Sequence, residues 1–208
     1  MTKLAFSTNA YTNHSMTTAI EHIADHGYSG VELLADQPHA YLPEFTVDER
    51  RNVIELLGDV DLTVSNINAN TAVGYYTDAP PSAFFEPSLC TATDADRAWR
   101  IDYTKQAIDL AEATDSPAVC VASGTALPGN PPQKAYENLV SSLREITAYA
   151  AAKDVKVGIE FEPELLIESV EDALTLIDDV DHPSLGINLD LGHVAVLGND
   201  PTDAIRRS

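Results

Sequence analysis

Six short apolar runs rich in β-branched residues alternate with helical patterns along almost all of the 208 residues. The runs predict strands at Lys3–Thr8, Gly30–Ala35, Leu62–Asn68, Ala118–Ser123, Lys156–Phe161 and Leu185–Leu189. Helices are expected at Met16–His26, Val47–Leu57, Asp94–Ala113, Pro132–Lys153 and Val170–Val180, and a sixth helix is expected to begin near Pro201. This alternation leaves two architectures, an open doubly wound parallel sheet or a closed barrel.

Several helix boundaries carry their own signals. Gly27 stands in the usual glycine position after a helix end, and Thr46 with Glu49 has the pattern of a capping box. Pro131 and Pro132 suit the first turn of the fourth helix. These local signals support the predicted order of elements.

Polar residues at the ends of the strands decide between the two architectures. The first strand leads into residues 7–11, which contain neither GxGxxG nor GxxxxGKS/T, the phosphate-binding loops of open nucleotide-binding sheets. Polar residues instead recur at the carboxyl end of strand after strand: Asn9, Glu32, Asn68, Asn70, Ser123, Glu160, Glu162 and Asp190. Such a ring forms the active-site face of a barrel. The sequence therefore predicts an α/β fold of the TIM (βα)8-barrel type, with residues 1–208 in one domain.

The number of βα units predicts a partial barrel. Six units are present, and an eight-stranded barrel needs two more, about 60 residues at roughly 30 per unit. An open six-stranded sheet exposes its first and sixth strands as hydrogen-bonding edges. We therefore expect the gap to be covered either by further βα units or by another chain, which includes a homo-oligomer.

The charge of the chain restricts its partners. There are 33 Asp and Glu residues against 12 Lys and Arg, a formal net charge of -21. Such a surface repels phosphate backbones and anionic lipids, so neither nucleic acid nor membrane is expected as a partner. The start of the chain lacks the features of a signal peptide, which favours the cytoplasm. Acid spread along the chain with little lysine favours a halophilic protein, whose charges are screened by salt, over a merely acidic one.

The cysteines and one long loop have weaker implications. Cys90 and Cys120 are too few and too far apart for a disulfide framework or a Cys-type zinc site. Cys120 is expected to pack inside a strand, and Cys90 to lie in a loop without an activating neighbour. A long loop is expected at Thr71–Thr93, with aromatic residues at 75, 76, 84 and 85. Loops of this length are usually lids or binding loops, and a surface insertion is the alternative.

Carboxylates follow the predicted strands in two segments, residues 157–164 and 186–193. Side chains alternate along a strand, so Glu160 and Glu162 share one face. Inward residues at the ends of adjacent barrel strands lie within a few Å, where two unpaired carboxylates repel each other. A divalent cation removes that repulsion, so Glu160 and Asp190 are predicted to bind Mn²⁺, Mg²⁺ or Zn²⁺.

His193 follows Asp190 by three residues, on the turn that leaves the strand. It is expected to approach the same site, as a ligand or as a substrate contact. Glu162 and Glu164 are candidates for the site, with surface carboxylates as the alternative. The remaining histidines are expected on loops or helix surfaces: His14, His22, His26, His39 and His182.

Three segments carry a resemblance to a known family: GVEL at 30–33, VGIEFEP at 157–163 and GINLDLGH at 186–193. In order and spacing the chain resembles the xylose-isomerase-like barrels, which include sugar-phosphate isomerases and epimerases, ketose 3-epimerases and inosose dehydratases. The resemblance implies that Glu160 and Asp190 bind the metal and that His193 contacts a sugar or sugar phosphate. Glu162, with Glu164 as the alternative, is implied near the substrate, and Glu32 and Asn68 complete the expected substrate-binding set.

The resemblance also implies a reaction, proton abstraction next to a carbonyl to give an enediolate stabilised by the divalent ion. Glu160 is the implied base, and isomerase, epimerase and dehydratase activities stay open. The family's third and fourth metal ligands, a His and a Glu on two further units, would fall after Ser208. The alternative is therefore a truncated, non-catalytic homologue that serves as a binding or assembly subunit.

The chain also resembles endonuclease IV, more distantly. That resemblance would imply a nucleic-acid enzyme with three zinc ions. Its site needs histidines at the ends of the third and fourth strands. Residues 66–70 and 122–124 contain no histidine, and the net charge of the chain is unsuited to DNA. We therefore reject this function.

Overall fold

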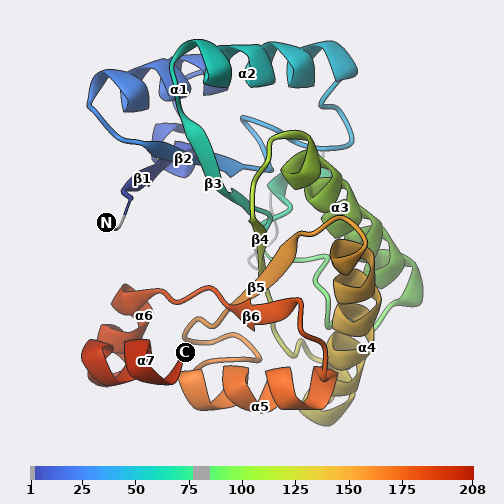
Figure 1. Ribbon diagram of the computed structural model, residues 1–208. Coiled ribbons are helices and arrows are strands. Elements are labelled where there is room, and N and C mark those ends of the chain that lie inside the picture. Colours follow the sequence, from blue (N-terminus) through green and yellow to red (C-terminus); the bar gives the residue numbers. More distant parts are fainter. Residues whose placement is uncertain (1–2, 77–84) are drawn as a thin grey trace.

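The computed structural model of the chain describes residues 3–76 and 85–208 (Figure 1). The strands of this part are β1 (Ala5–Ser7), β2 (Gly30–Leu34), β3 (Thr63–Asn68), β4 (Ala118–Ala122), β5 (Lys156–Glu160) and β6 (Leu185–Ile187). They form one parallel sheet in the order β1-β2-β3-β4-β5-β6. The predicted fold, about six βα units of a TIM-type barrel, is confirmed, with β1 and β6 at the edges of the sheet.

Helices connect the strands and cover the outside of the curled sheet (Figure 1). They are α1 (Met16–Asp25), α2 (Val47–Asp59), α3 (Asp94–Ala113), α4 (Pro132–Ala151), α5 (Val170–Val180), α6 (Leu191–Val196) and α7 (Pro201–Arg207). Two 3-10 helices, η1 (Thr8–Tyr11) and η2 (Val73–Tyr75), follow β1 and β3. Within the described residues, no helix combines the length and apolarity needed to cross a membrane.

The predicted helix signals act as expected. The Thr46 side chain accepts the amide of Glu49, and the Glu49 carboxylate accepts the amide of Thr46, so the capping box of α2 is complete. Gly27 follows α1 with φ of +79°, a conformation that favours glycine, and Pro132 is the first residue of α4. These caps satisfy backbone groups that each helix end leaves without an intrahelical partner.

Most predicted boundaries differ from the observed ones by one or two residues. Two differences bear on the site: the sixth strand ends at Ile187 rather than Leu189, and the short helix α6 was not predicted. The Asp190 carboxylate accepts the amides of Gly192 and His193 and so starts this helix shortly after the strand. The helix predicted to begin near Pro201 is present as α7.

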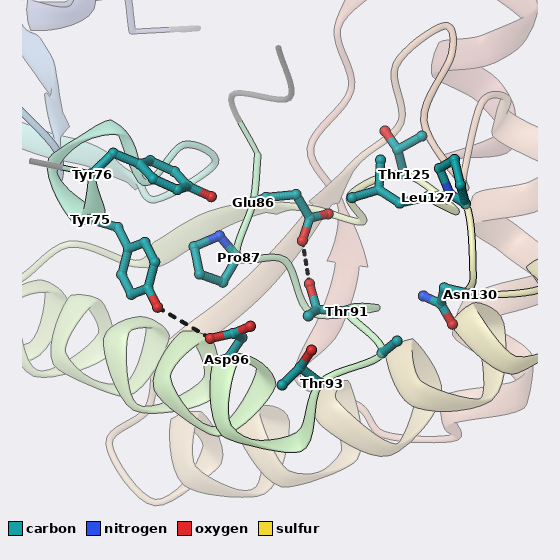
Figure 2. Close-up of a pocket in the computed structure, with 12 residues that line it drawn as sticks. Tyr75, Tyr76, Glu86, Pro87, Thr91, Thr93, Asp96, Thr125, Leu127 and Asn130 are labelled. Atoms are coloured by element: carbon teal, nitrogen blue, oxygen red, sulfur yellow. Dashed lines mark hydrogen bonds between the residues drawn. The ribbon is translucent and has the colours of Figure 1, made fainter. Parts of the chain in front are cut away.

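The loop predicted at Thr71–Thr93 is described only in part, because residues 77–84, including Phe84, lie outside the described residues. The Tyr75 ring packs against Trp99 on α3 at a centroid distance of 4.5 Å, and its hydroxyl donates to Asp96 at 3.2 Å. Tyr75, Asp96 and Glu86 line a cavity of about 450 Å³ (Figure 2). The lid interpretation stays a prediction.

Both cysteines are buried free thiols. Cys120 packs within β4 as expected, and Cys90 lies in the loop before α3, also as expected. Burial raises the pKa of Cys90 to about 11. The thiol is therefore protonated at neutral pH and unreactive as a nucleophile.

A glycine after β4 provides a test of the packing. Gly124 has φ of +81°, and a Cβ added there would overlap the Ser88 side chain. Gly124→Ala should therefore lower the free energy of unfolding by about 2–4 kcal/mol, which combines backbone strain with overpacking. Gly129→Ala is the matched control, because its φ is +91° but no atom lies within 4 Å of an added Cβ. The free energy of unfolding of both variants can be measured by urea denaturation, and an equal decrease in the two would contradict the packing argument.

Candidate functional site

The carboxyl ends of the strands surround a cavity of about 870 Å³. Its described polar lining comes from all parts of the sheet except β4: Ser7, Asn9, Glu32, Asn68, Asn70, Thr71, Glu160, Glu162, Asn188, Asp190 and His193. This set includes the residues that the sequence predicts for the site: Glu32, Asn68, Glu160, Glu162, Asp190 and His193. The structure therefore brings the predicted residues to one site, at the face where barrels carry their active sites.

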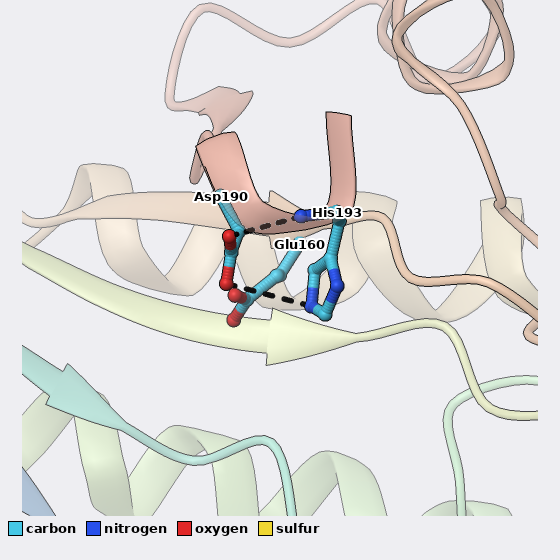
Figure 3. A group of neighbouring side chains, drawn as sticks. All are labelled: Glu160, Asp190 and His193. Atoms are coloured by element: carbon cyan, nitrogen blue, oxygen red, sulfur yellow. Dashed lines mark hydrogen bonds and ion pairs between the residues drawn. The ribbon is translucent and has the colours of Figure 1, made fainter. Parts of the chain in front are cut away.

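Three of these side chains form a candidate metal centre (Figure 3). Glu160, Asp190 and His193 each offer one ligand atom, and these atoms lie within 4.8 Å of one another. The donor set is two carboxylate oxygens and one imidazole nitrogen, which suits Mn²⁺, Mg²⁺ and Zn²⁺. The residues fit a divalent ion by both their chemistry and their spacing.

Asp190 is fixed by the helix that it caps. Its Oδ1 accepts the amides of Gly192 at 2.5 Å and His193 at 3.1 Å. Its Oδ2 lies 3.5 Å from Nε2 of His193. One oxygen is therefore held by the backbone, and the other is directed toward the remaining ligands of the cluster.

Glu160, the last residue of β5, is held in a similar way. Its Oε2 accepts the Nδ2 amide of Asn70 at 2.5 Å and lies 3.1 Å from Sγ of Cys120. Burial raises the pKa of Cys120, and the neighbouring Glu160 charge raises it further, so this thiol stays protonated and acts as a donor. Both interactions are made by one oxygen of Glu160, which leaves Oε1 for a ligand.

Glu162 adds a third carboxylate to the same side of the cavity. Its Oε1 lies 3.6 Å from Nε2 of His193. Burial raises the pKa of Glu162, His193 lowers it, and the charges of Glu160 and Asp190 raise it. Glu162 thus lies half-buried in the cavity beside His193, where it was expected as a candidate for the site.

Glu32, in the middle of β2, also lines the cavity. Its two carboxylate oxygens accept the side-chain amides of Asn66 at 2.9 Å and Asn68 at 3.4 Å. These neighbouring positions on β3 thus hold Glu32 across the strand pair. Glu32 and Asn68 therefore add hydrogen-bonding groups to the cavity lining.

Some candidates lie elsewhere. Ser123 was expected in the polar ring, but it is fully buried and accepts the amide of Ile167 outside the cavity. Glu164 is exposed on a turn, as in its surface alternative. His14, His22 and His26 are exposed as expected, and His39 lies in the loop after β2, also as expected, where its half-buried ring contacts Thr8 and the carbonyl of His14.

The sequence reasoning missed the contacts of Cys120 and Asn70 with Glu160. Cys120 was expected only to pack, and Asn70 was recognised only as a polar strand end. The signal available was the register, because β4 pairs Ala122 with Glu160 while β3 pairs Asn68 with Cys120. Cys120 pairs with Asn68 and Gly158, so Asn70 and Glu160 each lie two residues beyond its partners, close to its side chain.

Comparison with known proteins identifies the chain's relatives. It is 26% identical over 194 residues to the 3-dehydroshikimate dehydratase of Bacillus anthracis, covering 93% of this chain and 62% of that protein. It matches the structure of a D-tagatose 3-epimerase-like protein with a TM-score of 0.79 and 22% identity, over 99% of this chain and 71% of that one. The D-psicose 3-epimerase of Clostridium cellulolyticum H10 gives a TM-score of 0.79 at 17% identity, over 99% and 69%.

The chain thus spans about 62–63% of the length of the curated relatives that it matches. The family described as xylose isomerase-like TIM barrel matches residues 20–207, which include all the predicted site residues. The chain belongs to the xylose isomerase-like TIM barrel family.

Proposed function

We propose that this protein is a metal-dependent isomerase or epimerase of small sugars, acting by proton abstraction next to a carbonyl. The observation that carries the proposal is the cluster of Glu160, Asp190 and His193 at the carboxyl ends of the strands. The names of structural neighbours support the substrate class, since a D-tagatose 3-epimerase-like protein and a D-psicose 3-epimerase share the fold. The dehydratase relative keeps dehydration as a second reaction class that also begins at a carbon next to a carbonyl.

Each residue of the cluster has a proposed role in this reaction. Asp190 and His193 would hold the divalent ion, with Glu160 as the third ligand. A bound divalent ion supplies Lewis-acid stabilisation of the negative charge that develops on the substrate carbonyl oxygen. Glu160 is the proposed base, because one of its oxygens is held by Asn70 while the other faces the cavity.

The charge of the cavity favours an uncharged polyhydroxyl substrate over a sugar phosphate. Its described lining contains four carboxylates, Glu32, Glu160, Glu162 and Asp190, and no Lys or Arg. A single divalent ion does not neutralise four carboxylates, so a phosphate dianion would still be repelled. Sugar hydroxyls can donate hydrogen bonds to carboxylates, and they can both donate to and accept from side-chain amides.

Manganese titration followed by thermal unfolding tests the metal site. At a Mn²⁺ concentration of about 100 times Kd, mass action stabilises the folded state by about 2.7 kcal/mol. For a chain of this size we expect Tm to rise by roughly 5–10 °C. Asp190→Asn should abolish most of this rise, because asparagine still caps α6 but weakens the ligand.

Asp200→Asn is the matched control, since Asp200 caps α7 through the amide of Thr202 and lies outside the cavity. Its Tm should rise with Mn²⁺ as in the wild type. If Mn²⁺ leaves the wild-type Tm unchanged, the metal-dependent function is wrong, and the non-catalytic binding or assembly subunit becomes the better explanation.

A further inference from the structure

The carboxylate of Glu160 is held by groups from two other strands. Asn70, just after β3, donates to Oε2 of Glu160 at 2.5 Å, and its side chain is only 9% exposed. Cys120, on β4, places its Sγ 3.1 Å from the same Oε2 and 3.2 Å from Oδ1 of Asn70. Only the amide nitrogen of Asn70 can donate to a carboxylate, so the amide oxygen faces Sγ of Cys120, whose single S–H proton can be directed to either of the two oxygens.

The backbone that carries Asn70 is fixed as firmly as its side chain. Arg100, a fully buried residue of α3, donates to the carbonyls of Ala69 at 2.5 Å, Asn70 at 2.6 Å and Thr71 at 3.1 Å. The amide of Asn70 donates to Oδ1 of Asn68 at 3.2 Å. A planar guanidinium shared by three successive carbonyls leaves this turn little freedom.

The far side of the turn is held by a buried carboxylate. Asp36, which is 1% exposed, accepts the Thr71 hydroxyl at 2.5 Å and the amides of Val73 at 2.8 Å and Gly74 at 3.0 Å. Residues 69–74 thus lie between a buried cation and a buried anion. Burying the two ions costs free energy of desolvation, which a turn held only at the protein surface would not require.

We propose that Asn70 is the positioning residue of the metal site, which turns one oxygen of Glu160 toward Asp190 and His193 and is itself held by Arg100. The inference rests on the proposed function, in which Glu160 binds the divalent ion. A flexible Glu160 loses side-chain entropy when it binds a metal, whereas a preoriented one has lost that freedom on folding. Groups that orient metal ligands typically contribute 10–100-fold to metal affinity.

The test is the affinity of the protein for Mn²⁺ alone, measured by isothermal titration calorimetry at a temperature where every variant is folded. Asn70→Leu, which keeps the approximate volume but removes the donor, should raise Kd by about 10–100-fold. Asn70→Ser provides the same comparison if the leucine variant does not fold, because the serine hydroxyl is too short to replace the amide. The electron paramagnetic resonance spectrum of bound Mn²⁺ should change in both variants, since the arrangement of ligands is altered.

Asn138→Ala is the matched control for a merely structural loss. Asn138 is 5% exposed on α4 and donates to the carbonyl of Thr91 at 3.1 Å, outside the strand-end cavity. The Asn138→Ala variant should have a lower free energy of unfolding than the wild type but the same Kd for Mn²⁺. Wild-type affinity in Asn70→Leu or Asn70→Ser would overturn the positioning role alone, whereas absence of Mn²⁺ binding by the wild type would overturn the proposed function and this inference with it.

Discussion

Glu160→Gln is expected to lower kcat for ketose epimerisation by about 10²–10⁴-fold, the usual contribution of a positioned acid or base. Glutamine has almost the same shape as glutamate but cannot accept a proton at neutral pH. Its carbonyl oxygen can still accept the Asn70 amide, so its NH2 group would turn toward Asp190 and His193, where it cannot bind a metal. Both the rate and the Mn²⁺ affinity should therefore fall, which can be followed by epimerisation kinetics and by calorimetry.

Glu164→Gln is the matched control, because Glu164 lies four residues later on an exposed turn outside the cavity. It should keep the wild-type rate, affinity and stability. Incorporation of deuterium from D2O into the substrate isolates proton abstraction from later steps. If Glu160→Gln exchanges this deuterium at the wild-type rate, another group is the base and the role given to Glu160 fails.

The fold could be predicted from the sequence because the order of its strands and helices depends on local patterns. Apolar runs, the capping box at Thr46 and the glycine at position 27 each specify a boundary within a few residues of the chain. The helix α6 was missed because it is short and begins at Asp190, whose side chain acts both as a predicted ligand and as a cap. Capping by a residue with a second role is decided by tertiary structure, which a pattern along the chain does not contain.

The candidate site was predictable to the extent that it depends on strand ends. Glu160 and Asp190 follow buried strands, so barrel geometry alone places them at one face. The hydrogen bond from Asn70 to Glu160 joins residues that are 90 positions apart, and it depends on the register of β3, β4 and β5. No local pattern encodes such a contact, and Arg100 gave no signal, because a lone arginine in a helix is normally exposed.

Arg100→Met is expected to lower the free energy of unfolding by roughly 3–5 kcal/mol, the range observed when one partner of a buried charged network is removed. Methionine fills part of the space but donates no hydrogen bond, so the carbonyls of Ala69, Asn70 and Thr71 lose this donor. The Asp36 carboxylate would also lose a nearby cation. Chemical denaturation with urea, monitored by circular dichroism, measures the difference directly.

Arg51→Met is the matched control, because Arg51 is exposed on α2 and its ion-pair partner among the described residues is the exposed Asp48, at 3.0 Å. A surface substitution of this kind should change stability by less than about 0.5 kcal/mol. If the free energy of unfolding falls by a comparably small amount in both variants, water replaces the guanidinium and Arg100 does not hold the turn. A large loss in Arg100→Met together with a raised Kd for Mn²⁺ would instead link the buried guanidinium to Glu160 through Asn70, since Arg100 itself does not line the cavity.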